Sequence, residues 1–591
     1  MHVVRAPELV GRGGWINTGG QPYSLSDFRG RFLLLDFWTY CCINCLHVLD
    51  ELRPVETEFA DALVVVGVHS PKFVHEAEHA SVLAAVERYG VEHPVLDDPD
   101  LVTWNAYAIK AWPTLVLIDP TGRIVWTGSG EGHAHALTAL LRELVPRAEA
   151  DGTLRRSAGP FVAPETDATM LRFPAKAVRT DNGLLVADAG QHSVAVLNDD
   201  DVVRRYGTGE RGHADGPSSA ARFNEPNGLC LLPPEVAARV GYDIVIADTV
   251  NHRLRGLALD AGVVTTIAGD GRQWMQGDPV TSLSSPWDVE WWQDRVWIAM
   301  AGIHQLWTFD PLTGIVEVAA GTTNEGLRDG PANEAWLAQP SGLAADGDRL
   351  WFADSETSAL RFIQSTANGY RVETAIGRGL FDFGHRDGNA PEALLQHPLG
   401  VAVLADKRVA IADTYNGSIR VYDPDSGQVR TLVTGLAEPS GLVVDGDRLL
   451  AVESAAHRLV EVALVEGELM GREAHRTQRP TTDVSSVLEL DVVFSPPPGQ
   501  KLDERYGPSS RLNITATPPQ LLIEGEGRST DLRRTLRLDS AVGDGVLHIA
   551  ATAASCEDGE NAVCHIHQQD WGIPVRITPE GTTRLQIPLS G

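Results

Sequence analysis

The sequence contains no run of about 18 apolar residues, the length that a helix needs to cross a bilayer. The first 20 residues also lack the apolar core of a secretory signal peptide. We therefore expect a cytoplasmic protein without a membrane partner. Cysteine is scarce, with 6 residues among 591. So few cysteines exclude a disulfide-stapled secreted fold, and each one has to be judged by its own surroundings.

Basic residues are outnumbered, with 49 lysines and arginines against 79 aspartates and glutamates, and the formal net charge is -30. A field of that sign repels phosphate backbones and anionic lipids. We therefore predict no nucleic-acid partner. The cysteine cluster has no second Cys/His pair with zinc spacing near it, so we expect no metal, and we expect no cofactor.

The length predicts three or more domains, because a domain usually takes roughly 100–200 residues. The 57 glycines and 35 prolines indicate many tight turns, which favour β structure. Changes in pattern along the chain predict a first domain, a polar linker, a repeat region, a second linker and a C-terminal domain. Their expected bounds are 1–148, 149–172, 173–470, 471–486 and 487–591.

In the first domain, apolar runs typical of strands alternate with helical patterns. Strands are expected at 31–38, 63–70, 114–119 and 123–128, and helices after the cysteine cluster, around 73–89 and near 133–146. This alternation predicts a parallel or mixed sheet flanked by helices. His133 and His135 open the last helix, and we expect both to be solvated.

A Pro-x-Gly-apolar element recurs in the repeat region. It occurs four times as PNGL, PSGL, PLGV and PSGL, and PAKA (174–177) and PWDV (286–289) are degenerate copies. A second apolar run follows each copy. One such unit cannot bury both of its faces alone, whereas units stacked radially can. Segments such as ADTVNHRLRGL (247–257) resemble NHL repeats, which implies a six-bladed β-propeller with one blade per copy. The segments between blades are long and similar to one another, so we expect them to emerge on one face that carries partner or domain contacts.

In four of these second runs, the apolar strand residues are followed by Ala-Asp, at Asp188, Asp248, Asp354 and Asp413. A carboxylate at the end of a strand commonly accepts backbone N–H groups of the turn that follows. Because the residue repeats from blade to blade, we predict a structural role for it rather than a metal or catalytic ring. The C-terminal domain reads as alternating strands separated by Pro/Gly turns, which predicts a β-sandwich.

The strongest chemical signal is the segment Thr39-Tyr40-Cys41-Cys42-Ile43-Asn44-Cys45, between a buried strand and a helix. A cysteine in the first turn of a helix meets unpaired backbone N–H groups and the positive end of the helix dipole, and both favour the thiolate. A second cysteine three residues later lies one helical turn away. Attack by one sulfur and resolution by the other is then geometrically natural.

The first 150 residues resemble bacterial thiol reductases of the thioredoxin-like fold, with Cys42-Ile43-Asn44-Cys45 as the Cys-x-x-Cys motif. That resemblance implies that Cys42 is the nucleophile and Cys45 the resolving cysteine. It also implies that Asp36 accepts the proton of the resolving thiol. Trp112, Pro113 and Thr114 match the cis-proline loop that faces the dithiol and forms the substrate groove.

The domain order, together with Cys-Cys-Ile-Asn-Cys, is similar to the family called NHL repeat-containing protein two. The expected fold class is therefore multidomain, with an α/β thioredoxin-like domain, a six-bladed all-β NHL propeller and a C-terminal β-sandwich. Two positions depart from the thioredoxin pattern, because Cys41 stands at the site of the usual tryptophan and Asn44 at that of a proline. The direction of exchange is therefore left open, and Cys41 is a candidate third thiol.

The expected function is thiol–disulfide exchange with a protein disulfide substrate that the propeller holds. One alternative is an interaction scaffold in which the thioredoxin-like module has no catalytic role. A less favoured alternative is a peroxidase, because Thr39-x-x-Cys42 matches part of the peroxiredoxin signature. That signature requires a proline where this chain has Leu35.

Cys556 and Cys564 flank a polar turn after an apolar strand and are a candidate auxiliary redox pair. Their loop weakly resembles the Cys-rich loop of periplasmic thiol transporters, which implies a relay of electrons to or from Cys42. Two reduced loop cysteines are an equally open interpretation, and a zinc site with His565 or His567 is a remote one. Cys230 is expected to be a buried strand residue without chemistry.

Overall fold

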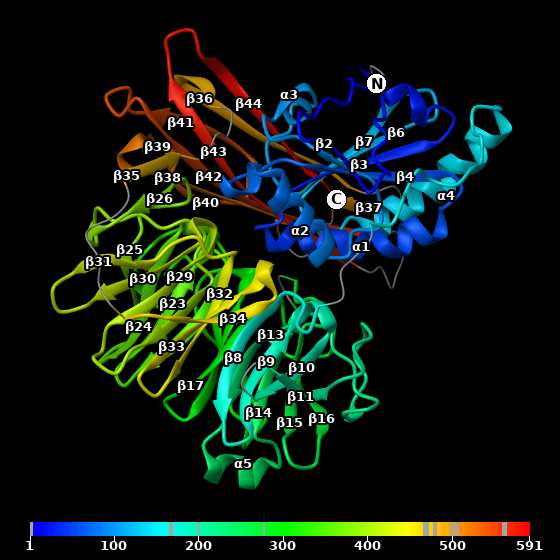
Figure 1. Ribbon diagram of the computed structural model, residues 1–591. Helices are drawn as coiled ribbons and strands as arrows, with labels where there is room; N and C mark the ends of the chain where they lie inside the picture. Colours follow the sequence, from blue (N-terminus) through cyan, green and yellow to red (C-terminus); the bar gives the residue numbers. More distant parts are fainter. Residues whose placement is uncertain are drawn as a thin grey trace. The chain divides into compact units, whose positions relative to one another are not determined.

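A computed structural model describes residues 4–164, 169–198, 201–275, 278–464, 472–476, 481–496, 500–502, 508–557 and 564–590 (Figure 1). The chain divides into two compact units. One contains residues 1–166 and 478–591, and the other contains residues 167–477. In the described ranges, no helix combines the length and the apolar character that crossing a membrane requires.

The N-terminal domain is built on a seven-stranded sheet with the strand order β1-β7-β6-β3-β4-β5-β2. Strand β3 is parallel to β4 and antiparallel to β6. The amphipathic helices α1 and α4 bury Leu52, Val55 and Leu141 in one core with the sheet. This is the thioredoxin-like fold that the sequence predicted. The strands are β1 (Val4–Arg5), β2 (Gly14–Ile16), β3 (Phe32–Trp38), β4 (Leu63–His69), β5 (Val95–Asp97), β6 (Thr114–Ile118) and β7 (Arg123–Ser129), and the helices are α1 (Ile43–Glu58), α2 (His79–Arg88), α3 (Val102–Ala106) and α4 (Ala134–Ala150).

The segment after α4 has no regular structure, yet it is held along the N-terminal domain. The Arg155 N–H donates to the Gly30 carbonyl at 2.6 Å, the Ser157 N–H to Asp61 at 2.9 Å and the Val162 N–H to Asn17 at 2.9 Å. Residues 151–162 therefore run over the surface of this domain.

Residues 167–477 form the six-bladed propeller. Consecutive strands pair in antiparallel fashion within each blade. The blades are β8 (Pro174–Thr180) with β9 (Gly183–Asp188), β10 (Ser193–Asn198) and β11 (Asp201–Tyr206); β13 (Pro226–Leu231) with β14 (Ile244–Asp248), β15 (Arg253–Ala258), β16 (Val263–Ala268) and β12 (Gly216–Pro217); β17 (Pro286–Trp292) with β18 (Arg295–Met300), β19 (Gln305–Phe309) and β20 (Val316–Ala320); β22 (Pro340–Asp346) with β23 (Arg349–Asp354), β24 (Ala359–Thr366), β25 (Gly369–Ile376) and β21 (Gly330–Pro331); β28 (Gly400–Val403) with β29 (Val409–Asp413), β30 (Ser418–Asp423), β31 (Gln428–Val433) and β27 (Gly388–Asn389); and β32 (Pro439–Asp445) with β33 (Arg448–Glu453) and β34 (Arg458–Val462). A short helix α5 (Pro234–Val240) and a separate pair of strands, β26 (Asp382–Arg386) and β35 (Arg472–Arg476), complete this unit.

The first strand of every blade lies in an inner ring, in which β8, β13, β17, β22, β28 and β32 contact one another in turn and β32 contacts β8. A hydrophobic core fills each of the six spaces between neighbouring blades. The last of these cores joins the sixth blade to the first, with Val443 and Val186 among its members. Closing the ring therefore buries the faces that a single blade would expose.

The glycine of the Pro-x-Gly element lies where neighbouring inner strands approach most closely. A Cβ at Gly342 would lie 2.5 Å from the Leu399 carbonyl oxygen, and one at Gly441 would lie 2.6 Å from that of Ala175. The two degenerate copies have Lys176 and Asp288 at this position. Their side chains form an ion pair at 2.6 Å, which joins the first blade to the third. The two departures from glycine are thus one paired feature of the inner ring.

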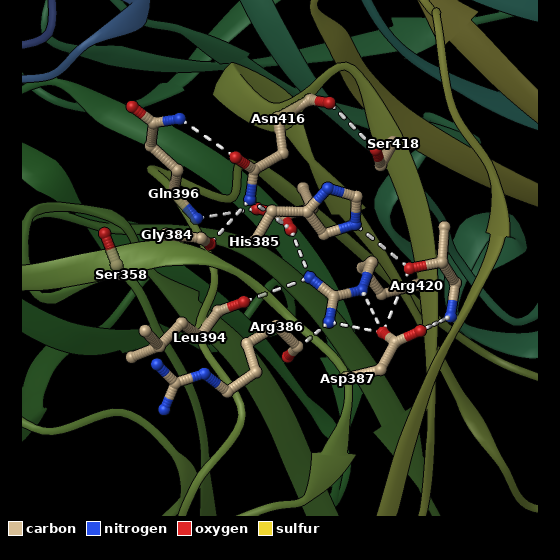
Figure 2. A network of polar contacts seen from close by, with 12 residues as sticks. Ser358, Gly384, His385, Arg386, Asp387, Leu394, Gln396, Asn416, Ser418 and Arg420 are labelled. Carbon is tan, nitrogen blue, oxygen red and sulfur yellow. Dashed lines mark hydrogen bonds and ion pairs between the residues drawn. The ribbon is translucent and has the colours of Figure 1, made fainter. Parts of the chain in front are cut away.

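The repeated aspartates belong to buried ion-pair networks, and Figure 2 shows the one around Arg420 in the fifth blade. The Arg420 guanidinium is fully buried and lies 2.8 Å from Asp413 and 2.6 Å from Asp387. It also donates to the backbone carbonyls of Leu394 and Arg386. Asp413 accepts the backbone N–H of Gln396 at 2.7 Å. Each ion is therefore compensated by opposite charge and by hydrogen bonds, as burial of a charge requires.

The same network recurs in other blades. Asp248 and Asp215 hold the buried Arg255, and Asp354 and Asp329 hold the buried Arg361. Asp188 pairs with Arg205, which lies on the fourth strand of its blade, whereas Arg255 and Arg361 lie on the third strands of theirs. The aspartates are structural, but the N–H groups that they accept belong to the segment before the inner strand instead of the following turn. In the third blade, Met300 stands in place of the aspartate and Trp307 in place of the buried arginine, and both side chains are buried and apolar.

The C-terminal domain is all-β in its described residues, whose nine strands form one hydrogen-bonded sheet that includes the long strand β36. The first residues of β36 pair with β43, and the later ones pair with β41 and β44. Leu488, Leu536, Ile549 and Trp571 come from β36, β41, β42 and β43 and meet in one core. The predicted β architecture of this domain is confirmed. The strands are β36 (Thr482–Ser495), β37 (Gln500–Leu502), β38 (Ser510–Thr517), β39 (Leu522–Glu524), β40 (Gly527–Ser529), β41 (Arg533–Leu538), β42 (Asp544–Glu557), β43 (Cys564–Ile577) and β44 (Thr582–Ser590).

Arg361→Met tests how strongly a blade depends on its network. The variant leaves the buried Asp354 carboxylate without its guanidinium, and breaking a buried pair in this way costs about 3–5 kcal/mol. We expect the free energy of unfolding of the propeller, measured by urea titration, to fall by that amount. Arg371→Met is the control, because Arg371 is 46% exposed and pairs with the exposed Glu373. It should change stability by less than about 1 kcal/mol, and equal losses in the two variants would contradict the assignment.

Candidate dithiol site

The two cysteines of the motif lie where β3 ends and α1 begins. All of β3 is buried, and Cys42 is the N-cap of α1, with its carbonyl accepting the Leu46 N–H at 3.2 Å. Cys42 is 7% exposed and Cys45 is fully buried. The structure contains both as thiols, and their side chains are hydrogen bonded to each other. The sulfurs thus face each other at the positive end of a helix dipole.

The environment of Cys45 keeps its thiol protonated. Burial raises its pKa well above the usual range, and the hydrogen bond with Cys42 acts in the same direction. The positive charge of Lys72 opposes this increase. A buried, protonated thiol one turn from a more accessible cysteine has the properties of a resolving group, because it reacts only after the outer sulfur is engaged.

Asp36 is fully buried on β3, opposite Gly67 of β4. Burial raises its pKa well above the usual range, and the negative charges of Glu56, Cys42 and Glu51 add to the increase. Neither carboxylate oxygen has a hydrogen-bond partner among the described residues. A carboxylate whose pKa is raised in this way is a stronger base than an exposed one, so it is suited to accept a proton.

The loop that the sequence identified as the substrate groove contains a cis peptide bond between Trp112 and Pro113. The Trp112 indole N–H donates to the Ser70 carbonyl at 2.8 Å, and its ring packs on that of Trp104. Thr114 begins β6 and donates its hydroxyl to the Ala111 carbonyl. All three groove residues are buried in this structure.

Sequence analysis did not identify Glu76, the carboxylate that organises the site. It is fully buried. One oxygen accepts the Thr39 hydroxyl at 2.6 Å and the Cys41 N–H at 3.0 Å, and the other accepts the N–H groups of Lys72 and Phe73. The carboxylate therefore ties the residues before Cys42 to the loop after β4. In the sequence, Glu76 looks like any charged residue at the start of a surface helix.

Lys72 is the second residue that sequence analysis did not identify. Its ammonium lies 5.5 Å from the centre of the Trp112 ring, which is within the range of a cation–π contact. Its charge also acts on Cys45. Lys72 therefore lies between the groove loop and the dithiol, and only the folded chain brings these three segments together.

Other residues near the site are held in structural roles. Cys41 is buried, with its sulfur 3.9 Å from the Thr39 hydroxyl. His69 is fully buried, and burial lowers its pKa to about 3, so it is neutral at physiological pH. The prediction for His133 was wrong, because it is 5% exposed and contacts the Ser129 carbonyl, whereas His135 is exposed as expected.

The remaining cysteines differ from one another. Cys230 is 3% exposed in the core between the second and third blades, as expected. Cys556 is disulfide-bonded, and Cys564 lies directly opposite it in the ladder of β42 and β43. The side chains of Cys564 and His565 lie outside the described residues. No group of three or more His, Cys, Asp or Glu gathers as a metal site in the part of the chain that the structure describes.

Comparisons with known proteins agree with the architecture. A thioredoxin-like family model matches residues 30–124, and an NHL repeat model matches residues 395–422. NHL repeat-containing protein 2 of Gallus gallus is 34% identical over 523 residues, which cover 78% of this chain and 70% of that protein. Protein DipZ of Mycobacterium tuberculosis is 35% identical over 142 residues, covering 24% of this chain and 20% of that protein.

Protein SUPPRESSOR OF QUENCHING 1, chloroplastic, of Arabidopsis thaliana is 33% identical over 526 residues. The match covers 82% of this chain but only 49% of that protein, so the chain spans about half the length of this relative. The chicken protein is matched over more than two thirds of its length. The chain therefore belongs to the NHL repeat-containing protein 2 family.

Proposed function

We propose that this chain is a thiol–disulfide oxidoreductase that acts on protein disulfides. The observation that carries the proposal is the hydrogen-bonded pair of thiols, Cys42 and Cys45, at the start of α1. The raised pKa of the nearby Asp36 and the cis-proline loop support it. Their combination matches what two-step exchange requires, namely an outer nucleophile, a protonated resolving thiol and a proton acceptor.

In the proposed cycle the Cys42 thiolate attacks one sulfur of a substrate disulfide. The substrate S–S bond breaks, a mixed disulfide forms, and the other substrate sulfur leaves as a thiolate. Cys45 then attacks the Cys42 sulfur and releases the second substrate thiolate, while its proton passes to Asp36. The substrate gains two electrons, and the two cysteines are oxidised to a disulfide.

The propeller would hold the protein that carries the disulfide. Its inter-blade segments contribute Asp215, Asp329 and Asp387 to the buried arginine networks. These segments are consequently anchored at several points by charge-assisted bonds. Loops that a rigid scaffold positions in this way are the usual place for partner recognition.

A non-catalytic scaffold is the second candidate, and one observation favours it. Cys42 has little exposed surface, Cys45 has none, and the groove residues are buried. A peroxidase receives less support, because the Thr39 hydroxyl that its signature requires donates to Glu76 instead.

Turnover of a disulfide distinguishes the enzyme from the scaffold. The full chain, kept reduced by a dithiol, should reduce oxidised insulin, and Cys42→Ser should slow the reaction by at least about 100-fold, because the nucleophile is lost. Cys230→Ala is the matched control, since it removes a buried thiol in the other unit and should leave the rate unchanged. Equal rates for wild type and Cys42→Ser would support the scaffold.

Lys72→Met tests the electrostatics of the dithiol. Because the positive charge opposes the increase in the pKa of Cys45, its removal should raise that pKa further. We expect the pH–rate profile of reduction to move to higher pH and the rate at pH 7 to fall by about three- to tenfold. Lys72→Arg should restore most of the rate, and Lys110→Met, at an exposed position of the same domain, should have no effect. An unshifted profile would assign Lys72 a purely structural role.

We also propose a narrower form of the function, in which the C-terminal disulfide exchanges with the dithiol. The presence of Cys556 in a disulfide while Cys42 and Cys45 are thiols supports it. Attack of Cys42 on that disulfide, followed by attack of Cys45 on Cys42, would leave the C-terminal cysteines reduced. Mass-spectrometric mapping of a Cys45→Ser variant should then find Cys42 joined to Cys556 or Cys564. Detection of no such species would eliminate the relay.

A further inference from the structure

The groove loop of the thioredoxin-like domain is in direct contact with the C-terminal domain. Ala111, the residue immediately before the cis-proline pair, belongs to the hydrophobic core of the C-terminal domain, where it joins Ile549 and Trp571. Strand β44 of the C-terminal domain contacts β7, the strand beside the groove loop. The groove loop thus packs against the C-terminal domain.

One polar side chain of the C-terminal domain reaches this contact. Gln569 packs on Gly130, and a Cβ built on that glycine would lie 3.6 Å from the amide carbon of Gln569. The Gly130 N–H in turn donates to the Pro113 carbonyl at 2.9 Å. Only one residue therefore separates the Gln569 amide from the backbone of the groove loop.

The position of Gln569 in its strand is unusual. The inward-facing residues that follow it in the same row of β43 are Trp571, Ile573 and Val575, which are buried and apolar. Gln569 is 6% exposed, yet its carbonyl oxygen has no hydrogen-bond partner among the described residues. A buried acceptor without a donor is costly, and an apolar residue would avoid that cost. A partner that is bound only part of the time is a physical reason for the amide.

We propose that β43 forms the second wall of the substrate groove and that Gln569 accepts a backbone N–H of an extended substrate segment. In the empty groove, the Gln569 amide packs on Gly130, and the described residues offer its carbonyl oxygen no hydrogen bond. A substrate segment entering between β43 and the cis-proline loop replaces this contact with a hydrogen bond. The inference rests on the proposed function, and it assigns the C-terminal domain a role in selecting polypeptide disulfides over small ones.

Gln569→Met tests the proposal, because it keeps the length of the side chain and removes the acceptor. With the full chain we expect KM for oxidised insulin to rise about tenfold and kcat to stay within twofold, as loss of one hydrogen bond predicts. The rate with 5,5′-dithiobis(2-nitrobenzoate), which has no peptide backbone, should not change. Gln568→Met, at the preceding residue of the same strand, is the matched control. Its carbonyl oxygen also lacks a partner among the described residues, but its side chain lies on the opposite face of β43, so the variant should behave as wild type.

Two further measurements exclude a merely structural effect and a failure of the proposed function. The unliganded Gln569→Met protein should be at least as thermally stable as wild type, because the variant removes a buried acceptor that lacks a donor. A structural glutamine would instead lower the melting temperature when replaced and impair both substrates. Binding of S-alkylated insulin B chain to the Cys42→Ser protein, measured by calorimetry, should weaken about tenfold when Gln569→Met is added. This test needs no turnover. An unchanged KM and an unchanged affinity, equal losses with both substrates, or no binding of the B chain would overturn the proposal.

Discussion

The carboxylate of Glu76 fixes the geometry on which the dithiol site depends. It accepts four hydrogen bonds from two segments that are far apart in the sequence, and two of the donors belong to Thr39 and Cys41, directly before Cys42. The N-terminus of α1 is thereby held at the end of β3. Because the sulfur positions follow from where that helix begins, one buried acceptor orients the whole site.

The site combines several groups whose protonation is controlled by burial. Cys45 and Asp36 both favour their neutral forms, and His69 is neutral as well. Lys72 is the basic residue whose charge acts against this trend at Cys45. A raised pKa makes the Asp36 carboxylate a stronger base, so its ionised form can take the proton of Cys45 and become a neutral carboxylic acid as the Cys45 thiol becomes a thiolate.

The propeller deals with buried charge in a different way. The thioredoxin-like domain leaves Asp36 without a hydrogen-bond partner among the residues that the structure describes, whereas the second, fourth and fifth blades surround a buried arginine with two carboxylates and backbone carbonyls. The third blade shows that Met300 and Trp307 can fill the same space. The buried ion pairs are thus not the only way to pack a blade, and in the second, fourth and fifth blades they additionally anchor the inter-blade segments.

Local patterns were sufficient to predict the architecture. The alternation of strands and helices, the repeated Pro-x-Gly element and the Cys-x-x-Cys segment each depend on neighbours within one element, so they are readable in a linear chain. The sequence did not predict several tertiary features. These are the packing of Ala111 and Gln569, the ion pair between Lys176 and Asp288, and the burial of Glu76 and His133. Each of these joins segments distant in sequence, and whether a charged or polar side chain is buried depends on what folds over it.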